Sequence, residues 1–291
     1  FFIFWEEGKM NKKKSRRNVP PNFLGQHLLH HRKTIDEIVR IANVSTQDIV
    51  LDLGAGKGAL TNLLSHKAKK VLAVEYDEKF IGILKDKFRD KENTIIIQQD
   101  ILKLKLPKED FIVVANIPYA ITTPILKKLL NDPVSNFQKG VILMEKGAAK
   151  RFTSKFVKDP YVIAWRMWFD LRFEKSVPRK YFSPPPRVDS AIVSITRKKK
   201  PLVPYQERFN FWGLVDYVLR YPNVCIDDAL RGVFTVPQIK QLKRNLKIHS
   251  EIPVGTLSEQ QWAIIHETMI KYVPKFRWPK VRKEKFYYLK R

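Results

Sequence analysis

Short apolar segments alternate with helical patterns between residues 49 and 144, and no other feature constrains the fold as strongly. The apolar segments are residues 49–53, 71–75, 94–98, 111–115 and 141–144. Helical patterns fill the intervals at residues 59–65, 78–88 and 124–130, and another precedes them at residues 34–42. Strands that are apolar along their whole length are typical of a parallel sheet covered by helices on both faces. The sequence therefore predicts an α/β fold.

The pattern changes beyond residue 150. Residues 161–173 and 188–196 are rich in aromatic and β-branched side chains, which strands favour. A proline run at residues 184–186 provides a turn between them. We expect these two segments to form a late pair of antiparallel strands.

The last third of the chain is predicted to be helical. Residues 207–272 show helical patterns, and the basic run at residues 198–201 indicates a linker before them. Short loops are expected at Pro222, Pro237 and Gly255. The resulting regions are a basic flexible arm over residues 1–20, an α/β domain over residues 21–200, a smaller all-helical domain over residues 201–272 and a basic tail over residues 273–291.

Three glycines mark a candidate cofactor site. Gly54, Gly56 and Gly58 follow the first apolar strand and precede a helical pattern. Glycine lets the backbone turn tightly and approach a ligand closely, because it has no Cβ. Glu75 ends the next strand, about 20 residues on, where a carboxylate can bind two ribose hydroxyls. The segment predicts a site for a nucleotide-like cofactor.

Two cofactors fit this arrangement. Gly54, Gly56 and Ala59 also satisfy the pyrophosphate fingerprint of dinucleotide-binding proteins. S-adenosylmethionine is favoured by Asp100, which ends the third strand and can accept a hydrogen bond from an adenine amino group. It is also favoured because the sequence after residue 144 does not begin a second mononucleotide-binding half.

The segment Asn116-Ile117-Pro118-Tyr119 ends the fourth strand and suits a planar base with an exocyclic amine. The Asn116 side-chain oxygen and the Ile117 carbonyl can accept the two amino hydrogens. Pro118 stiffens the turn, and Tyr119 can stack on the base. Phe182 is expected to supply a second stacking face. Together with the cofactor site, these residues predict methyl transfer to the amine of an adenine.

The charge of the chain indicates where that adenine lies. Lys and Arg number 55 against 29 Asp and Glu, which gives a formal net charge of +26. The excess is concentrated, with six basic residues in 9–17 and nine in 271–291. Such clustering favours a polyanionic partner, and an adenine within nucleic acid is expected.

Several other classes are not indicated. Cys225 is the only cysteine, so no disulfide framework is expected and a reducing, cytoplasmic compartment fits. No Cys/His cluster has metal-ligand spacing, and no apolar run approaches the ~18 residues of a membrane span. Residues 1–9 precede Met10, and we interpret them as translated upstream sequence.

These residues resemble the ribosomal RNA adenine N6-dimethyltransferases over residues 22–272. Residues 25–29, Gly-Gln-His-Leu-Leu, are similar to the family's first motif, which usually reads Gly-Gln-Asn-Phe-Leu. The resemblance implies a Rossmann-like class I methyltransferase sheet. It places His27, Leu29, Gly54, Glu75, Asp100 and Asn116 at cofactor-binding positions, and Tyr119 and Phe182 at base-stacking positions. His27 stands where the family usually has Asn.

Within that family the chain resembles the Erm branch, which dimethylates one adenine of 23S rRNA and gives resistance to macrolides, lincosamides and streptogramin B. Ile117 matches the Erm form, whereas the housekeeping 16S branch usually has Leu at that position. Residues 144–152 and 255–262 match the branch over longer stretches. A monomer is expected, acting on protein-free 23S rRNA or an early assembly intermediate.

Three alternatives remain open at this point. The chain can belong to the housekeeping 16S branch, or it can be a non-catalytic RNA-binding or transcription factor on the same fold. The intact Gly54, Glu75, Asp100 and Asn116 argue against lost catalysis. A DNA adenine methylase typically has Asp where this chain has Asn116.

Overall fold

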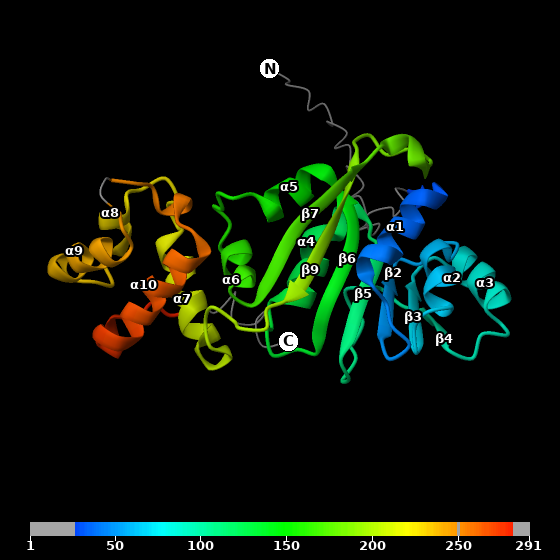
Figure 1. The fold of residues 1–291 in the computed structure, drawn as a ribbon, viewed down its shortest axis with the longest axis horizontal. Coiled ribbons are helices and arrows are strands. Elements are labelled where there is room, and N and C mark those ends of the chain that lie inside the picture. The colour runs from blue at the N-terminus through cyan, green and yellow to red at the C-terminus, as the bar shows by residue number, and fades with distance from the viewer. Residues whose placement is uncertain (1–26, 249–250, 282–291) are drawn as a thin grey trace, which may run out of the picture.

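A mixed sheet of seven strands forms the centre of the computed structural model, which describes residues 27–248 and 251–281 (Figure 1). The strand order is β4-β3-β2-β5-β6-β9-β7. The first five of these are parallel: β4 Thr94–Gln98, β3 Lys70–Glu75, β2 Ile49–Leu53, β5 Phe111–Asn116 and β6 Phe137–Glu145. The parallel sheet predicted for residues 49–144 is confirmed.

Helices cover both faces of this sheet, as the apolar strands require. Helices α1 Arg32–Ala42, α2 Ala59–Ser65 and α3 Glu78–Lys87 cover one face, and α4 Thr122–Leu130, α5 Lys146–Thr153 and α6 Pro160–Trp168 cover the other. Strand β5 shows the alternation, because Ile112 and Val114 pack with α1 and α2, whereas Val113 and Ala115 pack with α4 to α6.

The late strand pair is real, but its first member was placed too early. Strands β7 Phe169–Val177 and β9 Ser190–Arg197 pair antiparallel, and β9 also pairs with β6. Residues 161–168, which were predicted to begin a strand, instead lie in α6. The Asp159 side chain caps this helix by accepting from the Tyr161 amide at 2.9 Å, and Pro160 occupies its first turn. Composition favoured a strand, but the Asp-Pro start signal decided the structure.

A short two-stranded sheet brings the N-terminal segment to the carboxyl ends of the parallel strands. Strand β1 Leu28–Leu29 pairs antiparallel with β8 Phe182–Ser183. Two 3₁₀ turns adjoin it, η1 Tyr119–Ile121 and η2 Arg179–Tyr181. The carboxyl edge of an open parallel sheet is the usual place for a ligand.

The helical part of the chain is confirmed. It contains α7 Arg208–Val218, α8 Ile226–Leu230, α9 Val236–Asn245 and α10 Glu259–Tyr272, with 3₁₀ turns η3 Tyr205–Glu207, η4 Val254–Thr256 and η5 Lys275–Arg277. Pro237 was predicted to mark a loop, but it lies in the first turn of α9, where a missing amide hydrogen costs nothing. Thr235 and Gln238 form a capping box there.

The junction between the two parts is packed rather than extended. The run 198–201, which was predicted to be a linker, is tied to α6, because the amides of Lys198 and Leu202 donate to the carbonyls of Trp168 and Met167, each at 2.8 Å. One continuous apolar cluster runs from the α4–α6 face of the sheet into the helical part, and the rings of Trp168 and Phe211 meet edge to face within it.

Part of the predicted basic tail also belongs to the folded structure. Trp278 Nε1 donates to the Val273 carbonyl at 2.7 Å, and Trp278 and Val281 pack against the main apolar cluster. The expectations for residues 1–20, including that for residues 1–9, lie outside the described residues, as does the rest of the tail. Within the described ranges, no helix combines the length and apolar character needed to cross a membrane.

Candidate active site

The glycine loop leaves β2 with left-handed backbone at three positions. The φ angles are 79° at Gly54, 53° at Gly56 and 74° at Gly58, a region that side chains with a Cβ rarely adopt. A Cβ at Gly56 would lie 2.8 Å from the Leu28 side chain, and one at Gly58 would lie 2.7 Å from Phe88. Gly54 and Gly56 line a pocket that opens to solvent, whereas Gly58 does not line it and instead precedes helix α2.

Glu75 ties this loop to the end of β3. Its Oε2 accepts from the Gly56 amide at 2.8 Å, and its Oε1 accepts from the amides of Tyr76 and Asp77 at 2.8 and 2.9 Å. The residue is 4% exposed and lines the same pocket. Three backbone donors therefore hold an acceptor at the edge where a ribose is expected.

Asp100 and its neighbours form the next part of the wall. One carboxylate oxygen of Asp100 accepts from the Leu102 amide at 2.8 Å, which fixes the side chain at the end of β4. Tyr76 and Ile101 add an aromatic and an aliphatic surface to the pocket, and the sequence reasoning missed both. Tyr76 directly follows Glu75, and Ile101 directly follows Asp100. A residue next to an acid at a strand end shares that edge of the sheet, so this position in the sequence could have identified both.

Asp52 is a third carboxylate beside the site, and it was not predicted from the sequence. It lies on β2, where every other residue is apolar, and its Oδ2 accepts from Thr61 Oγ1 at 2.6 Å. Burial raises the pKa of Asp52 to about 7, the Thr61 hydrogen bond opposes that rise, and the nearby Glu75 adds to it. Its Oδ1 is buried and has no hydrogen-bond partner. A charged residue in an apolar strand beside the glycine loop was the signal that pointed to it.

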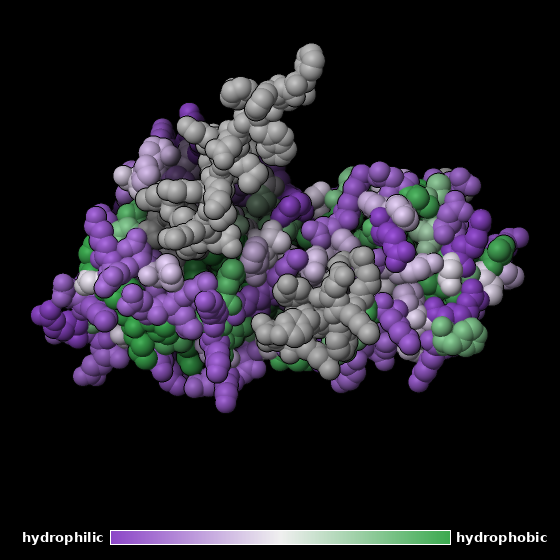
Figure 2. Space-filling model, turned by 180° about the vertical axis from the view of Figure 1, so that it is seen from behind, coloured by the Kyte–Doolittle hydropathy of each residue, from purple (hydrophilic) through white to green (hydrophobic). Residues whose placement is uncertain are grey.

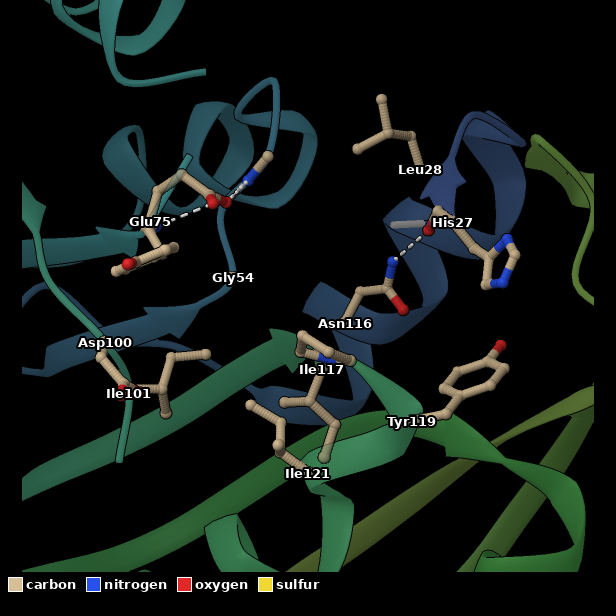
Figure 3. A pocket seen from close by; sticks show the side chains of 13 residues that line it. His27, Leu28, Gly54, Glu75, Asp100, Ile101, Asn116, Ile117, Tyr119 and Ile121 are labelled. Atoms are coloured by element: carbon tan, nitrogen blue, oxygen red, sulfur yellow. Dashed lines mark hydrogen bonds between the residues drawn. The ribbon is translucent and has the colours of Figure 1, made fainter. Parts of the chain in front are cut away.

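Asn116 is oriented by a backbone group of the first motif. Its Nδ2 donates to the His27 carbonyl at 2.9 Å. A carbonyl can only accept, so the amide nitrogen must face His27 and Oδ1 is left as the acceptor on the pocket side. Figure 3 shows Asn116, His27 and Tyr119 on one side of the pocket and Glu75, Asp100 and Ile101 on the other.

Tyr119 and His27 place two rings at the Asn116 end. Their centroids are 5.7 Å apart with the planes tilted by 40°. The His27 ring is held by a hydrogen bond between Nδ1 and the Pro184 carbonyl at 2.8 Å, in which the ring nitrogen must be the donor. The Tyr119 hydroxyl is hydrogen-bonded to Ser190 Oγ. Burial raises the pKa of Tyr119, the Ser190 bond opposes the rise, and Glu145 and Asp189 add to it.

One of the two predicted stacking residues does not face the pocket. Phe182 was expected to stack on the base, but its ring is 1% exposed and packs with Leu29 and Ile192 in the core, because β8 pairs with β1 and turns this side chain inward. Leu29 is likewise buried and lines a pocket adjoining the first, whereas the Leu28 side chain lines both. The side chain of Ile117 is buried at 1%, so its backbone is the part that can serve a ligand.

The donor set fits S-adenosylmethionine. A buried carboxylate at Glu75 suits a ribose, and Asp100 suits an adenine amino group. The glycine loop lets the rest of the S-adenosylmethionine molecule come close to the protein backbone. No group of His, Cys, Asp or Glu within residues 27–248 and 251–281 is arranged to hold a metal ion.

Comparisons with known proteins agree with this geometry. The sequence profile of the family described as ribosomal RNA adenine dimethylase matches residues 19–271. An rRNA adenine N-6-methyltransferase of Bacillus licheniformis is 57% identical over 277 residues, which is 95% of this chain and 96% of that protein. A ribosomal RNA small subunit methyltransferase A of Streptococcus thermophilus is 36% identical over 65% of this chain and 69% of that protein.

Solved structures share the fold. The crystal structure of the 23S rRNA methyltransferase ErmE superposes with a TM-score of 0.76 at 24% identity, covering 84% of this chain and 99% of that one. The dinucleotide alternative is thereby set aside, since both the family and the fold are those of S-adenosylmethionine-dependent methyltransferases.

Proposed function

Because the chain belongs to the ribosomal RNA adenine dimethylase family, whose members transfer methyl groups from S-adenosylmethionine to adenine N6, we propose that its target is one adenine of 23S rRNA. The product would be a ribosome resistant to macrolides, lincosamides and streptogramin B. We propose that the chain acts as a monomer on protein-free 23S rRNA or an early assembly intermediate.

The observation that carries the choice of branch is the extent of similarity. The Bacillus adenine N-6-methyltransferase matches 95% of the chain at 57% identity, whereas the small-subunit enzyme matches 65% of it at 36%. Residues 144–152, in α5 and the strand end before it, and residues 255–262, in the helical part, also resemble the Erm branch.

The chemistry at the Asn116 end of the pocket follows from the orientation of its amide. S-adenosylmethionine supplies a methyl group on a positively charged sulfur. The amino nitrogen of adenine is a weak nucleophile, because its lone pair is delocalised into the ring. Asn116 Oδ1 accepts one amino hydrogen and the Ile117 carbonyl accepts the other. These two hydrogen bonds keep electron density on the amino nitrogen and direct its lone pair at the methyl group.

Tyr119 and Pro118 define where the base lies. The Tyr119 ring gives the adenine a stacking surface once the base has left its RNA helix. Pro118 stiffens the turn that carries Tyr119 and the Ile117 carbonyl. We propose that Glu75 holds the ribose of the cofactor and that Asp100 holds its adenine. At Gly54 and Gly56, which have no Cβ, the cofactor can approach the protein backbone closely.

An expression experiment tests the proposed target. Residues 10–291, expressed in a sensitive bacterium, should raise its tolerance to erythromycin and clindamycin. The Asn116→Ala variant should not, since loss of one oriented hydrogen-bond partner lowers turnover by roughly 10²–10³. Mass spectrometry of 23S and 16S rRNA from the same cells locates the methyl groups.

The alternative predicts a different pattern. A housekeeping enzyme would methylate 16S rRNA and leave drug tolerance unchanged. That result, obtained with soluble and folded protein, would assign the chain to the small-subunit branch and overturn the 23S proposal.

A further inference from the structure

The Tyr119 hydroxyl is joined to a residue that does not line the pocket. Its partner, Ser190 Oγ, is fully buried at the start of β9, 71 residues further along the chain. The bond connects the turn after β5 to the strand on the far side of β6. Stacking on a base requires only the face of a ring, so this bond needs another explanation.

A tyrosine ring that is held at its hydroxyl cannot swing about its own side-chain bonds without breaking the hydrogen bond. The Tyr119 hydroxyl remains protonated at neutral pH, since burial raises its pKa, and it can therefore donate to Ser190. Ser190 is fully buried, so its hydroxyl left alone would be a buried polar group without a hydrogen bond, which is unfavourable. The ring plane is consequently fixed from within the protein.

The segment between β8 and β9 also fixes the neighbouring His27 ring. His27 is held by the Pro184 carbonyl, and Pro184 and Ser190 both belong to the segment that leads from β8 into β9. Figure 3 shows the His27 ring directed towards Tyr119 at the same side of the pocket. One segment, residues 184–190, therefore sets both aromatic rings at the place where the target base is expected.

We propose that Ser190 is a positioning residue for the methyl transfer: its hydroxyl holds the Tyr119 ring in the orientation on which the adenine stacks, before the RNA arrives. This inference rests on the proposed function, in which Tyr119 contacts the target base. Ser190 itself touches neither cofactor nor RNA. Ser190 restricts rotation of the Tyr119 side chain in the free protein, so that less conformational entropy is lost when the base binds.

A double-mutant cycle tests the proposal, with variants Ser190→Ala, Tyr119→Phe and the combination. Single-turnover methylation is measured on the rRNA that the parent protein methylates, 23S or 16S. Each single variant should lower the rate of methyl transfer about five- to tenfold, the loss expected for one hydrogen bond. The double variant should be no slower than the slower single variant, because both changes remove the same bond.

Two further readouts separate positioning from general damage. The dissociation constant for S-adenosylmethionine should stay within about twofold of the parent's, and so should RNA affinity, since phosphate contacts dominate it. Ser194→Ala is the matched control, because Ser194 lies on the same strand and bonds Glu174 away from the pocket. It should leave the methylation rate unchanged.

Two outcomes would overturn the proposal. If the losses of the two single variants multiply in the double variant, the hydroxyls act independently. If Ser190→Ala weakens cofactor binding as much as it slows transfer, the residue has only a structural role. Methylation found on 16S instead of 23S would refute the proposed target but leave the cycle measurable, so the two failures can be told apart.

Discussion

Glu75 accepts three backbone hydrogen bonds within the protein, from Gly56, Tyr76 and Asp77. A carboxylate has about four acceptor positions, so roughly one remains for a ribose hydroxyl. The residue therefore shapes the glycine loop and offers a ligand contact at the same time. A change at this position should affect both folding and cofactor affinity.

Glu75→Gln tests this double role. The amide nitrogen of Gln cannot accept from a backbone N–H, so the glycine loop loses one tie and the ribose loses a charged acceptor. We expect the dissociation constant for S-adenosylmethionine to rise about 10- to 100-fold, with a lower melting temperature. Calorimetry on the variant, the parent and the exposed neighbour Glu78→Gln measures both. Unchanged affinity in Glu75→Gln would rule out the ribose contact.

Asp52 gives a pH dependence with a defined sign. Its pKa is raised from 3.8 to about 7 in the folded protein, chiefly by burial. Between these values the folded state holds a proton that the unfolded state has lost, so this residue makes stability fall as pH rises from about 4 to about 7. Above that range the full cost of burying the charge is present.

Asp52→Asn should remove that dependence. The variant's free energy of unfolding, relative to the parent's, should increase by about 2–3 kcal/mol between pH 5 and pH 8. Any cost of burying an amide is independent of pH and cancels in this comparison. Denaturant titrations of both proteins at the two pH values, without cofactor, measure the difference. Parallel pH profiles would contradict the raised pKa.

At the scale of elements, the glycine loop can be tested by one pair of substitutions. Gly58 has a φ of 74°, and a Cβ there would lie 2.7 Å from Phe88 and 2.9 Å from Leu84. Gly58→Ala combines backbone strain with overpacking, so we expect a loss of about 1–4 kcal/mol in stability and weaker cofactor binding.

Gly82→Ala is the matched control for this loss. Gly82 lies inside α3, and nothing stands within 4 Å of the position its Cβ would take. Alanine favours the helix, so this variant should gain about 0.5–1 kcal/mol. Thermal unfolding of both variants measures the contrast. Similar effects in the two would mean that the Gly58 backbone relaxes readily.

At the scale of the whole molecule, the net charge of +26 predicts RNA binding that weakens steeply with salt. Figure 2 shows hydrophilic side chains over both the α/β and the helical parts on the face opposite that of Figure 1. The last ten residues alone contribute five cations, namely Arg282, Lys283, Lys285, Lys290 and Arg291.

Two truncations separate charge from folding. Ending the chain at Val281 should flatten the log–log salt dependence of RNA binding by about one to three units and leave the melting temperature unchanged. Ending it at Val273 also removes Trp278 and exposes Gly213, whose Cβ position lies 2.1 Å from the Pro279 carbonyl, so stability should fall. Equal salt slopes for the parent and the shorter truncation would show that the last ten residues do not contact RNA.

Features that depend on near neighbours along the chain can be predicted from the amino-acid sequence. Apolar strands, the glycine loop and the acids at strand ends are local patterns, and the position of Glu75 at the end of β3 follows from them. The start of α6 is also encoded locally, because Asp159 and Pro160 form a helix start signal, although the aromatic residues within the helix favour a strand by composition.

Contacts between distant parts of the chain set which side chains share the base end of the pocket. Phe182 and Tyr119 are both aromatic and both follow strand-like segments, yet one is buried in the core and the other lines the pocket. The pairing of β8 with β1 and the bond from Ser190 to Tyr119 settle this, and each joins residues far apart in sequence. Contacts of that kind depend on how the sheet closes, and no pattern along the chain encodes which face of β8 turns inward.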